Sequence, residues 1–351
     1  MGSVNAISKP TPVNPRLSSL PGESFPVCII GLGLIGGSLM RDLAAAGWPV
    51  FGWNRSAHTV KVANRSGFDV SGDLDATLRR AEAEKALVVL GVPMPALPRM
   101  LEAIAQHAPS VGFTDVTSVK AEVHELVEQH GLTDRFVGGH PMAGTANSGW
   151  DATMSGLFDG AVWVITYDNA KNRGQRGARL WLDTWRRTVQ MAEAVGAAVV
   201  PTVARRHDSA VARISHLPHV LAEALAVTGD MGGPLSLTLA ATSFRDGTRV
   251  AGTEPELVRA MCENNREALV KALDEALALL QKAREDIASP GQDLHRLATE
   301  GHAARMRFEA RAGRKVKDAP RRPIIRVQPG APGWTDQLSS AESMGAQIGI
   351  F

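Results

Sequence analysis

The chain has 351 residues, of which 44% are hydrophobic and 21% charged, a balance that excludes a wholly disordered protein. Its formal net charge of +2 is too small to indicate nucleic acid as the main partner. Two cysteines do not make a disulfide framework and fit a reducing, cytoplasmic compartment, and without a run of about 18 apolar residues we expect no membrane contact. The length suggests two domains, each with its own core.

The N-terminal residues 1–24 are rich in Pro, Ser and Asn and contain no apolar signal core. We expect a flexible leader here rather than a targeting peptide.

A glycine-rich turn follows the first predicted strand. The apolar run 27–30 leads into Gly-Leu-Gly-Leu-Ile-Gly, a helix follows, and residues 49–53 form a second predicted strand. In such a turn the first glycine permits tight bending, the second lets a diphosphate approach the backbone, and the third brings the helix close to its strand. A turn that holds nothing is the weaker alternative in this strand–helix context. The pattern predicts a dinucleotide site that includes Gly31, Gly33, Leu34, Ile35 and Gly36.

The second predicted strand ends at Asn54, Arg55 and Ser56, where an NAD-specific site usually carries an acidic side chain. A guanidinium and a hydroxyl suit a 2′-phosphate, whereas a carboxylate would repel it. We therefore expect NADP rather than NAD, although Arg55 could instead stack on adenine or face solvent. Val92, at the end of a later strand, is assigned to the same cofactor site.

Strands alternate with helices as far as residue 203, which predicts βαβ units and a parallel sheet. The expected helices span 57–67, 73–84, 98–107, 120–130 and 180–195, and the expected strands span 86–93, 111–116, 136–138, 161–166 and 197–201. Ligands of such sheets bind beyond the carboxyl ends of the strands. The first domain is therefore expected to be a dinucleotide-binding domain at residues 25–203.

Two polar side chains follow predicted strands at this edge of the sheet. His140 lies in a stretch restricted by a proline and glycines, and a histidine held there could accept a proton near neutral pH. The alternative is a histidine that merely caps a turn. Ser118 precedes a predicted helix, where serine is usually an N-cap, and that role is compatible with a catalytic one.

Strand signals disappear after residue 203, and residues 204–313 are expected to form an all-helical substrate and dimerisation domain. The helical patterns cover 206–226, 234–242, 254–287 and 292–312. Their apolar content exceeds what a thin cover for the sheet needs, which favours a homodimer. Residues 314–351 are expected to be a low-complexity tail with a solvated basic cluster: Arg314, Lys315, Lys317, Arg321, Arg322 and Arg326.

Two groups of residues in the helical half could bind a ligand. His216 and His219 share one helical face, and Asp246 and Arg249 belong to a stretch, 243–251, that is expected to be a loop. A metal site that adds His207 or Asp208 lacks a normal ligand set, and core histidines without function are a second alternative. A cationic pocket for a multiply charged anion near the nicotinamide is the preferred interpretation.

In combination, the motifs resemble those of the prephenate/arogenate dehydrogenase family of tyrosine biosynthesis. The similar segments occur in family order between about 25 and 310: 31–36, 115–120 (Asp-Val-Thr-Ser-Val-Lys), 140–144 (His-Pro-Met-Ala-Gly), His207-Asp208, 215–219 (Ser-His-Leu-Pro-His) and 244–249 (Phe-Arg-Asp-Gly-Thr-Arg). The resemblance implies a Rossmann-type domain, a helical dimerisation domain, and NAD(P)-dependent oxidative decarboxylation of prephenate to 4-hydroxyphenylpyruvate, or the corresponding reaction of arogenate.

The resemblance also implies roles for single residues. His140 accepts the proton of the substrate's ring hydroxyl, and Ser118 hydrogen-bonds that hydroxyl and the nicotinamide. His219 and Arg249 hold the substrate carboxylates with support from His216, and Asp246 is assigned to the same substrate group.

The chain also departs from the family pattern. Some relatives carry a gating Glu where Ala146 stands, and some carry a Trp three residues after the proline that corresponds to Pro255, where this chain has Val258. A regulatory domain of about 70 residues does not fit after Gly313, so we do not expect tyrosine feedback through one.

Two other functions are the alternatives to a dehydrogenase. A β-hydroxyacid or imine reductase would normally need a catalytic lysine at the start of the helical domain. A non-catalytic NAD(P)-sensing protein would have no need of His140 and Arg249 together.

Overall fold

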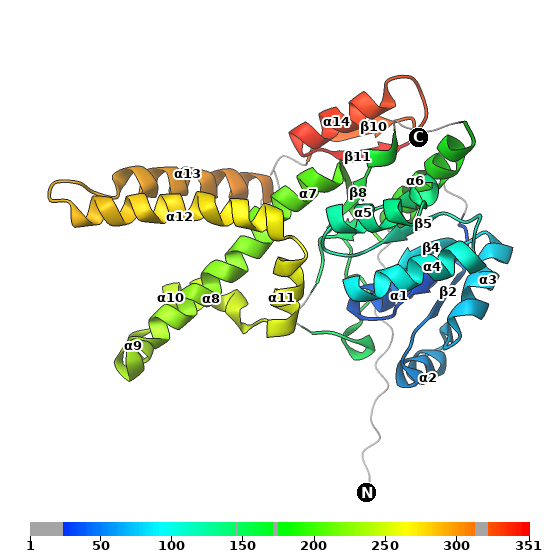
Figure 1. The fold of residues 1–351 in the computed structure, drawn as a ribbon, viewed down its shortest axis with the longest axis horizontal. Helices are drawn as coiled ribbons and strands as arrows, with labels where there is room; N and C mark the ends of the chain where they lie inside the picture. The colour runs from blue at the N-terminus through cyan, green and yellow to red at the C-terminus, as the bar shows by residue number, and fades with distance from the viewer. Residues whose placement is uncertain (1–23, 145–146, 171–174, 313–321) are drawn as a thin grey trace, which may run out of the picture.

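A six-stranded parallel sheet is the centre of the N-terminal domain in the computed structural model, which describes residues 24–144, 147–170, 175–312 and 322–351. The strand order is β3-β2-β1-β4-β5-β6, so the order reverses between β1 and β4. The strands are β1 Val27–Ile30, β2 Val50–Trp53, β3 Asp69–Ser71, β4 Leu87–Leu90, β5 Phe113–Asp115 and β6 Phe136–Val137. The helices between them are α1 Leu34–Ala45, α2 Ala57–Arg65, α3 Leu74–Glu84, α4 Leu97–His107 and α5 Ala121–Gln129 (Figure 1).

The central strand β1 is apolar throughout because both of its faces are covered. Val27 and Ile29 belong to one hydrophobic cluster, and Cys28 and Ile30 belong to a second. Alternate residues of a strand point to opposite faces, so the two clusters are the two layers that pack on this sheet. The predicted parallel α/β domain is confirmed.

A second, three-stranded sheet follows, and the sequence had not separated it from the first. It contains β7 Gly139–Pro141, β8 Val162–Thr166 and β9 Ala198–Thr202, with β7 antiparallel and β9 parallel to β8. Helix α6 Gln175–Ala194 connects β8 to β9. The expectation that 197–201 returns to the first sheet is therefore wrong, because these residues pair with β8. His140 lies on β7, where the chain passes from one sheet to the other.

The second half of the chain is helical, as predicted, up to residue 312. It contains α7 Ala204–Val211, a π-helical turn Ala212–His216, α8 Leu217–Asp230, α9 Gly233–Leu239, α10 Thr242–Gly247, a 3₁₀ turn Arg249–Gly252, α11 Pro255–Glu263, α12 Arg266–Ala288 and α13 His295–Ala312. Helices α12 and α13 project together from the body as one arm, and α8 and α9 form a second (Figure 1). None of the described helices is long and apolar enough to cross a membrane.

Two expectations about the helical half are wrong. Residues 254–287 are not one helix, because α11 ends at Glu263 and Asn265 adopts non-helical dihedral angles before α12. Residues 243–251 are not a loop, because Phe244 to Gly247 lie in α10 and Arg249 begins the 3₁₀ turn.

The C-terminal segment is also ordered, contrary to the expected low-complexity tail. Residues 324–350 form a C-terminal module of β10 Ile324–Val327, α14 Trp334–Met344 and β11 Gln347–Ile350, whose two strands pair in parallel. Trp334, Leu338 and Ala341 recur at helical spacing and are buried in the same cluster as the first sheet. This apolar stripe explains why the segment folds onto the body. Four of the six basic residues, Arg314 to Arg321, lie outside the described residues, whereas Arg322 and Arg326 are exposed.

Candidate active site

A cleft of about 1170 Å³ opens at the carboxyl ends of β1 and β4, where the strand order reverses. Such a switch point is where doubly wound sheets bind their ligands. The cleft brings together most of the predicted cofactor residues: Gly31, Gly33, Leu34, Ile35, Gly36, Asn54, Arg55 and Val92.

The glycines of the turn fit a diphosphate. Gly31 has φ +100°, and an added Cβ there would lie 2.6 Å from the Gly91 carbonyl oxygen. A Cβ on Gly36 would lie 2.1 Å from the Gly31 carbonyl oxygen, whereas one on Gly33 would meet nothing within 4 Å. No side chain of the described residues caps α1 at Gly33. The first N–H groups of α1 are therefore accessible from the cleft, as a phosphate requires.

Ser56 is the predicted cofactor residue that does not line the cleft. Its hydroxyl caps α2 by accepting a hydrogen bond from the Thr59 amide at 3.3 Å. Asn54 and Arg55 do face the cleft, and Arg99 of α4, which the sequence did not single out, lines it as well.

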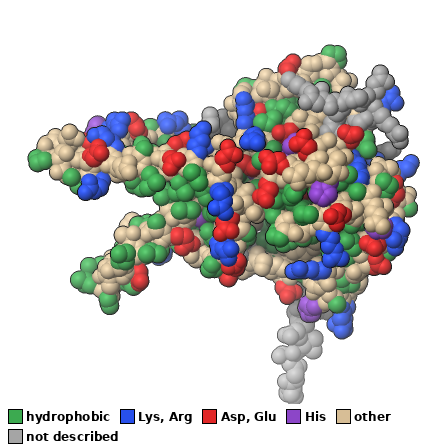
Figure 2. Space-filling view, viewed as in Figure 1, with side chains coloured by type: hydrophobic (Ala, Val, Ile, Leu, Met, Phe, Trp, Pro, Cys, Tyr) green, Lys and Arg blue, Asp and Glu red, His purple; other side chains and the backbone are tan. Residues whose placement is uncertain are grey.

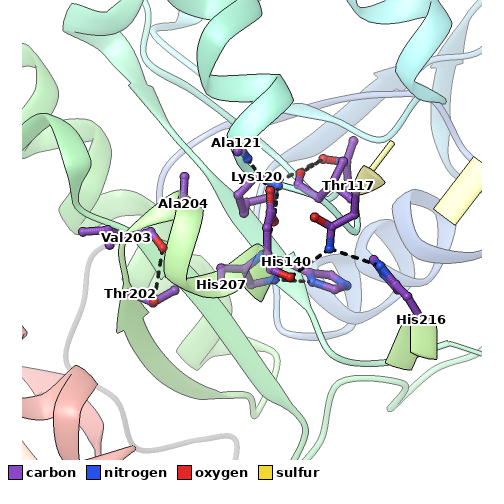
Figure 3. A network of polar contacts seen from close by, with 12 residues as sticks. Thr117, Lys120, Ala121, His140, Thr202, Val203, Ala204, His207 and His216 are labelled. Carbon is purple, nitrogen blue, oxygen red and sulfur yellow. Dashed lines mark hydrogen bonds and ion pairs between the residues drawn. The ribbon is translucent and has the colours of Figure 1, made fainter. Parts of the chain in front are cut away.

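His140 also lines the cleft, and a chain of hydrogen bonds begins at its imidazole (Figure 3). His140 Nδ1 lies 2.8 Å from His207 Nε2, and His207 Nδ1 lies 2.7 Å from Asp208 Oδ1. A carboxylate can only accept, so His207 donates from Nδ1, and its Nε2 then accepts from His140 Nδ1. This arrangement leaves Nε2 of His140 as the unprotonated nitrogen. From the sequence, His207 and Asp208 enter only as part of a family motif and as possible metal ligands, and the hydrogen bonds that link them to His140 are not predicted.

Asp208 caps the start of α5, where the sequence had predicted Ser118 as the N-cap. The amides of Lys120 and Ala121, at the start of α5, donate to its two carboxylate oxygens at 2.8 and 2.7 Å. Burial opposes ionisation of Asp208, but the hydrogen bonds from His207 and from these amides outweigh it and lower the pKa of the carboxyl group. Ser118 therefore does not cap α5, and it lines the same cleft as His140.

A buried ion pair holds the backbone next to His140. Lys120 Nζ contacts Asp115 Oδ2 and donates to the Gly139 carbonyl oxygen at 2.7 Å, while Asp115 Oδ1 accepts from the Gly139 amide at 3.1 Å. Both ions are almost fully buried. The pair thus fixes both peptide groups of the residue before His140.

These surroundings favour a neutral His140. Burial lowers the pKa of its imidazole well below the ordinary value, and the nearby His207, Lys120 and His216 act in the same direction. A neutral imidazole with a free Nε2 in a cleft can act as a proton acceptor.

His216 lies behind this chain of hydrogen bonds and is buried in the π-helical turn. Asn265 Nδ2 lies 3.1 Å from His216 Nδ1 and donates to the Asp208 backbone carbonyl at 2.8 Å. Burial lowers the pKa of His216 to about 4. Asn265 was missed by the sequence because it lay inside a presumed continuous helix. The Asn264-Asn265 pair was the available signal, since asparagine is a poor helix former.

The remaining predicted substrate residues lie outside the cleft. His219 is one turn further along α8, and its Nδ1 lies 2.9 Å from the Ser215 carbonyl oxygen. Asp246 and Arg249 are exposed, the first on α10 and the second on the 3₁₀ turn that packs beside α8. Ala146 lies outside the described residues, and from α11 it is Leu257, next to Val258, that lines the cleft. Within the described part of the chain, no three His, Cys, Asp or Glu side chains are grouped as metal ligands.

Fold and site together define a class of protein: a two-domain NAD(P)-dependent oxidoreductase with a histidine in the lining of its nucleotide cleft. The profile of the prephenate dehydrogenase nucleotide-binding domain matches residues 41–189, and that of the prephenate dehydrogenase dimerization domain matches residues 203–300. The chain belongs to the prephenate dehydrogenase family.

Individual relatives agree with this assignment. A cyclohexadienyl dehydrogenase of Zymomonas mobilis is 33% identical over 76% of this chain and 90% of its own length. A crystal structure of a candidate prephenate dehydrogenase from Corynebacterium glutamicum is 55% identical with a TM-score of 0.88, covering 93% of this chain and 99% of that one. A prephenate dehydrogenase of Aquifex aeolicus, solved with hydroxyphenyl propionate and NAD⁺, is 25% identical with a TM-score of 0.69, over 82% and 100% of the two chains.

Proposed function

We propose that this protein is a prephenate dehydrogenase, which converts prephenate to 4-hydroxyphenylpyruvate and CO₂ with reduction of a nicotinamide cofactor. The observation that carries the proposal is the chain from His140 through His207 to Asp208, which ends at the cleft with an unprotonated imidazole nitrogen. Oxidation of a ring carbinol needs such a proton acceptor beside the hydride acceptor.

In this reaction His140 Nε2 takes the proton of the ring hydroxyl while the carbinol carbon gives up a hydride. The bound nicotinamide supplies the hydride acceptor. Loss of the ring carboxylate as CO₂ leaves its bonding electrons in the ring, which becomes an aromatic phenolate, and the phenolate oxygen takes back the proton from His140. His207 and ionised Asp208 orient the imidazole and stabilise the charge that it acquires. Ser118, on the same cleft wall, is assigned the hydrogen bond to the hydroxyl and the nicotinamide.

For the substrate carboxylates we propose His219 and Arg249, with support from His216, whereas Asp246, which only accepts hydrogen bonds, is assigned to a donor group of the substrate. His219 and Arg249 lie on neighbouring segments, because the turn that begins at Arg249 packs beside α8. Neutral His216 supports the group from its buried position.

We further propose that NADP is preferred over NAD. Asn54 and Arg55 follow β2 on the cleft wall without an acidic side chain, and Arg99 lines the same cleft. A second guanidinium on this wall favours the additional phosphate.

The deciding experiment offers prephenate and arogenate to the purified protein, each with NAD⁺ and with NADP⁺, and follows absorbance of the reduced cofactor. We expect turnover with prephenate; turnover with arogenate alone would shift the assignment to the amino-bearing substrate. No turnover with either substrate under any cofactor would refute the proposal.

We also propose that the protein is a homodimer built through its helical domain. Large apolar side chains are exposed along α8, α9 and α12, among them Leu225, Val227, Leu235, Leu239, Leu277 and Leu280. Figure 2 shows hydrophobic side chains gathered on both arms. A second copy of the chain is the partner that would cover this surface.

A further inference from the structure

A carboxylate from the C-terminal module reaches into the body of the protein. Glu342 lies on α14, and its side chain is only 8% exposed. Its Oε1 accepts hydrogen bonds from Thr202 Oγ1 at 2.7 Å and from the Val203 amide at 3.0 Å. Its Oε2 accepts from the Tyr167 hydroxyl at 2.6 Å and from Arg206 Nη1 at 3.0 Å.

These partners surround the beginning of α7. Val203 is the N-cap residue of that helix, and the next amide, that of Ala204, donates to both carboxylate oxygens of Asp168 at 3.1 and 3.0 Å. The first amides of a helix have no partner within the helix, so carboxylates placed there fix its start.

A short path leads from Glu342 to the proton acceptor. The Val203 amide donates to Glu342, and the Val203 carbonyl accepts from the His207 amide at 3.0 Å. His207 then contacts His140, and Asp208 fixes the start of α5. Figure 3 shows Thr202, Val203 and Ala204 on the segment that leads into His207.

The module contacts the body at several places besides Glu342. The Trp334 ring packs edge-on against Trp185 with centroids 5.1 Å apart, and Leu338 is fully buried. Arg186 also donates to the Pro329 carbonyl oxygen at 2.7 Å. Loss of the Glu342 carboxylate therefore leaves the apolar contacts of the module in place.

We propose that Glu342 is a positioning residue for the His207–Asp208 pair and, through it, for His140. The proposal rests on the proposed function, in which His140 accepts the substrate proton. The C-terminal module thereby contributes to the reaction without touching substrate or cofactor.

Charged and titratable groups face His140 from every element packed around it. They are Asp115 and Lys120 from the buried ion pair, His207 and Asp208 from α7, and His216 from the π-helical turn. Glu342 itself faces Tyr167, Arg206 and, across the helix start, Asp168. If the start of α7 is released, His207 and Asp208 no longer hold the imidazole of His140 in one orientation, so we expect kcat to fall and its pH profile to change.

The test compares Glu342→Ala and Glu342→Gln with Leu338→Ala, a control that weakens the module's apolar contacts but keeps the carboxylate. We expect Glu342→Ala to lower kcat on the order of 10-fold with little change in the KM for the cofactor. Glu342→Gln, which retains one acceptor oxygen, should recover part of the loss. Leu338→Ala should lower Tm and leave the pH profile of kcat in place.

Two outcomes would overturn the inference: an unchanged kcat and pH profile in both Glu342 variants, or equal changes in Leu338→Ala. NMR titration of the His140 and His207 imidazoles gives a readout that does not need turnover. An inactive wild-type protein would refute the proposed function, whereas NMR titration curves of His140 and His207 that are the same in wild type and in Glu342→Ala would refute this inference alone. If Glu342→Ala does not fold, the same measurements are made on Glu342→Gln, in which we expect a smaller change.

Discussion

The imidazole of His140 owes its neutrality to burial and to three nearby groups that carry or can acquire positive charge. A histidine whose pKa is lowered stays unprotonated to a pH below the ordinary value of about 6.5. We expect kcat/KM to remain high through the range in which a free histidine would titrate, and to fall only as the pH passes through the lowered pKa. A profile between about pH 4.5 and 8, with folding checked by circular dichroism, tests this. An acid limb centred above 6.5 would contradict it.

Removing the proton acceptor has a large expected effect on turnover. His140→Asn keeps a polar side chain of similar size but has no basic nitrogen, so kcat should fall on the order of 100-fold or more. Cofactor affinity, measured by fluorescence titration, should stay near that of wild type because the glycine turn is untouched. Near-normal turnover would remove His140 from the mechanism.

Arg55 gives a separate prediction about cofactor choice. Arg55→Asp places an anion beside the expected 2′-phosphate, so kcat/KM for NADP⁺ should fall at least about 10-fold while that for NAD⁺ changes less. Lys61→Asp, on the neighbouring α2, changes the net charge by the same amount and is the control. It should not change the ratio of kcat/KM for NADP⁺ to that for NAD⁺. Equal effects of Arg55→Asp on the two cofactors would mean that Arg55 does not read the phosphate.

Among the elements, the buried ion pair of Asp115 and Lys120 connects β5 to β7 through the peptide groups of Gly139. Removing one partner leaves an uncompensated buried charge, which typically costs about 3–5 kcal/mol. Lys120→Met should lower the free energy of unfolding by about that amount in urea denaturation. Lys282→Met, which breaks an exposed pair with Asp286, should cost about 1 kcal/mol or less. Equal losses in the two variants would contradict this account.

Sequence reasoning succeeded where local pattern and tertiary role agree. The apolar strands β1 and β4 and the glycine turn predicted the sheet and the cleft, because a strand covered on both faces must be apolar and a close turn needs glycine. The sequence also predicted that His140 and Ser118 follow strand ends at one edge of the sheet, and both line the cleft, while their catalytic roles stay predictions.

The misses occur where distant contacts override local preference. Asn265 ends one helix and begins another because its side chain bonds the Asp208 carbonyl and His216, partners that no local pattern shows. The C-terminal module was not predicted from the sequence, because its strands are short and Pro and Gly residues flank them. The spacing of Trp334, Leu338 and Ala341 was a helical signal that composition alone obscured. The start of α5 is capped by Asp208 and not by Ser118. Because Asp208 lies 90 residues further along the chain, no local pattern predicts this contact.

At the scale of the molecule, the two arms expose more apolar surface than a lone chain tolerates well. We expect a mass near twice 37.3 kDa in light scattering. Leu235→Glu combined with Leu239→Glu, which lie one turn apart on α9 and are 70% and 71% exposed, should shift the protein toward the single-chain mass. Gln337→Glu, on the exposed face of α14, should leave the mass unchanged. A wild-type protein of single-chain mass would refute the homodimer.

The five-residue π-helical turn between α7 and α8 determines how the helical domain is rotated relative to the nucleotide domain. A π turn holds one residue more than the α-helical turn that it replaces. Deleting Ile214, which points mostly to solvent, would restore ideal helical winding yet rotate everything beyond it by about 100°. His216, His219 and Asn265 would then rotate together, away from Asp208 and the nucleotide domain. A deletion that improves local helical geometry would thus separate His140 from the residues proposed to bind the substrate carboxylates. The extra residue of the π turn therefore sets the rotation of the helical domain relative to the nucleotide domain.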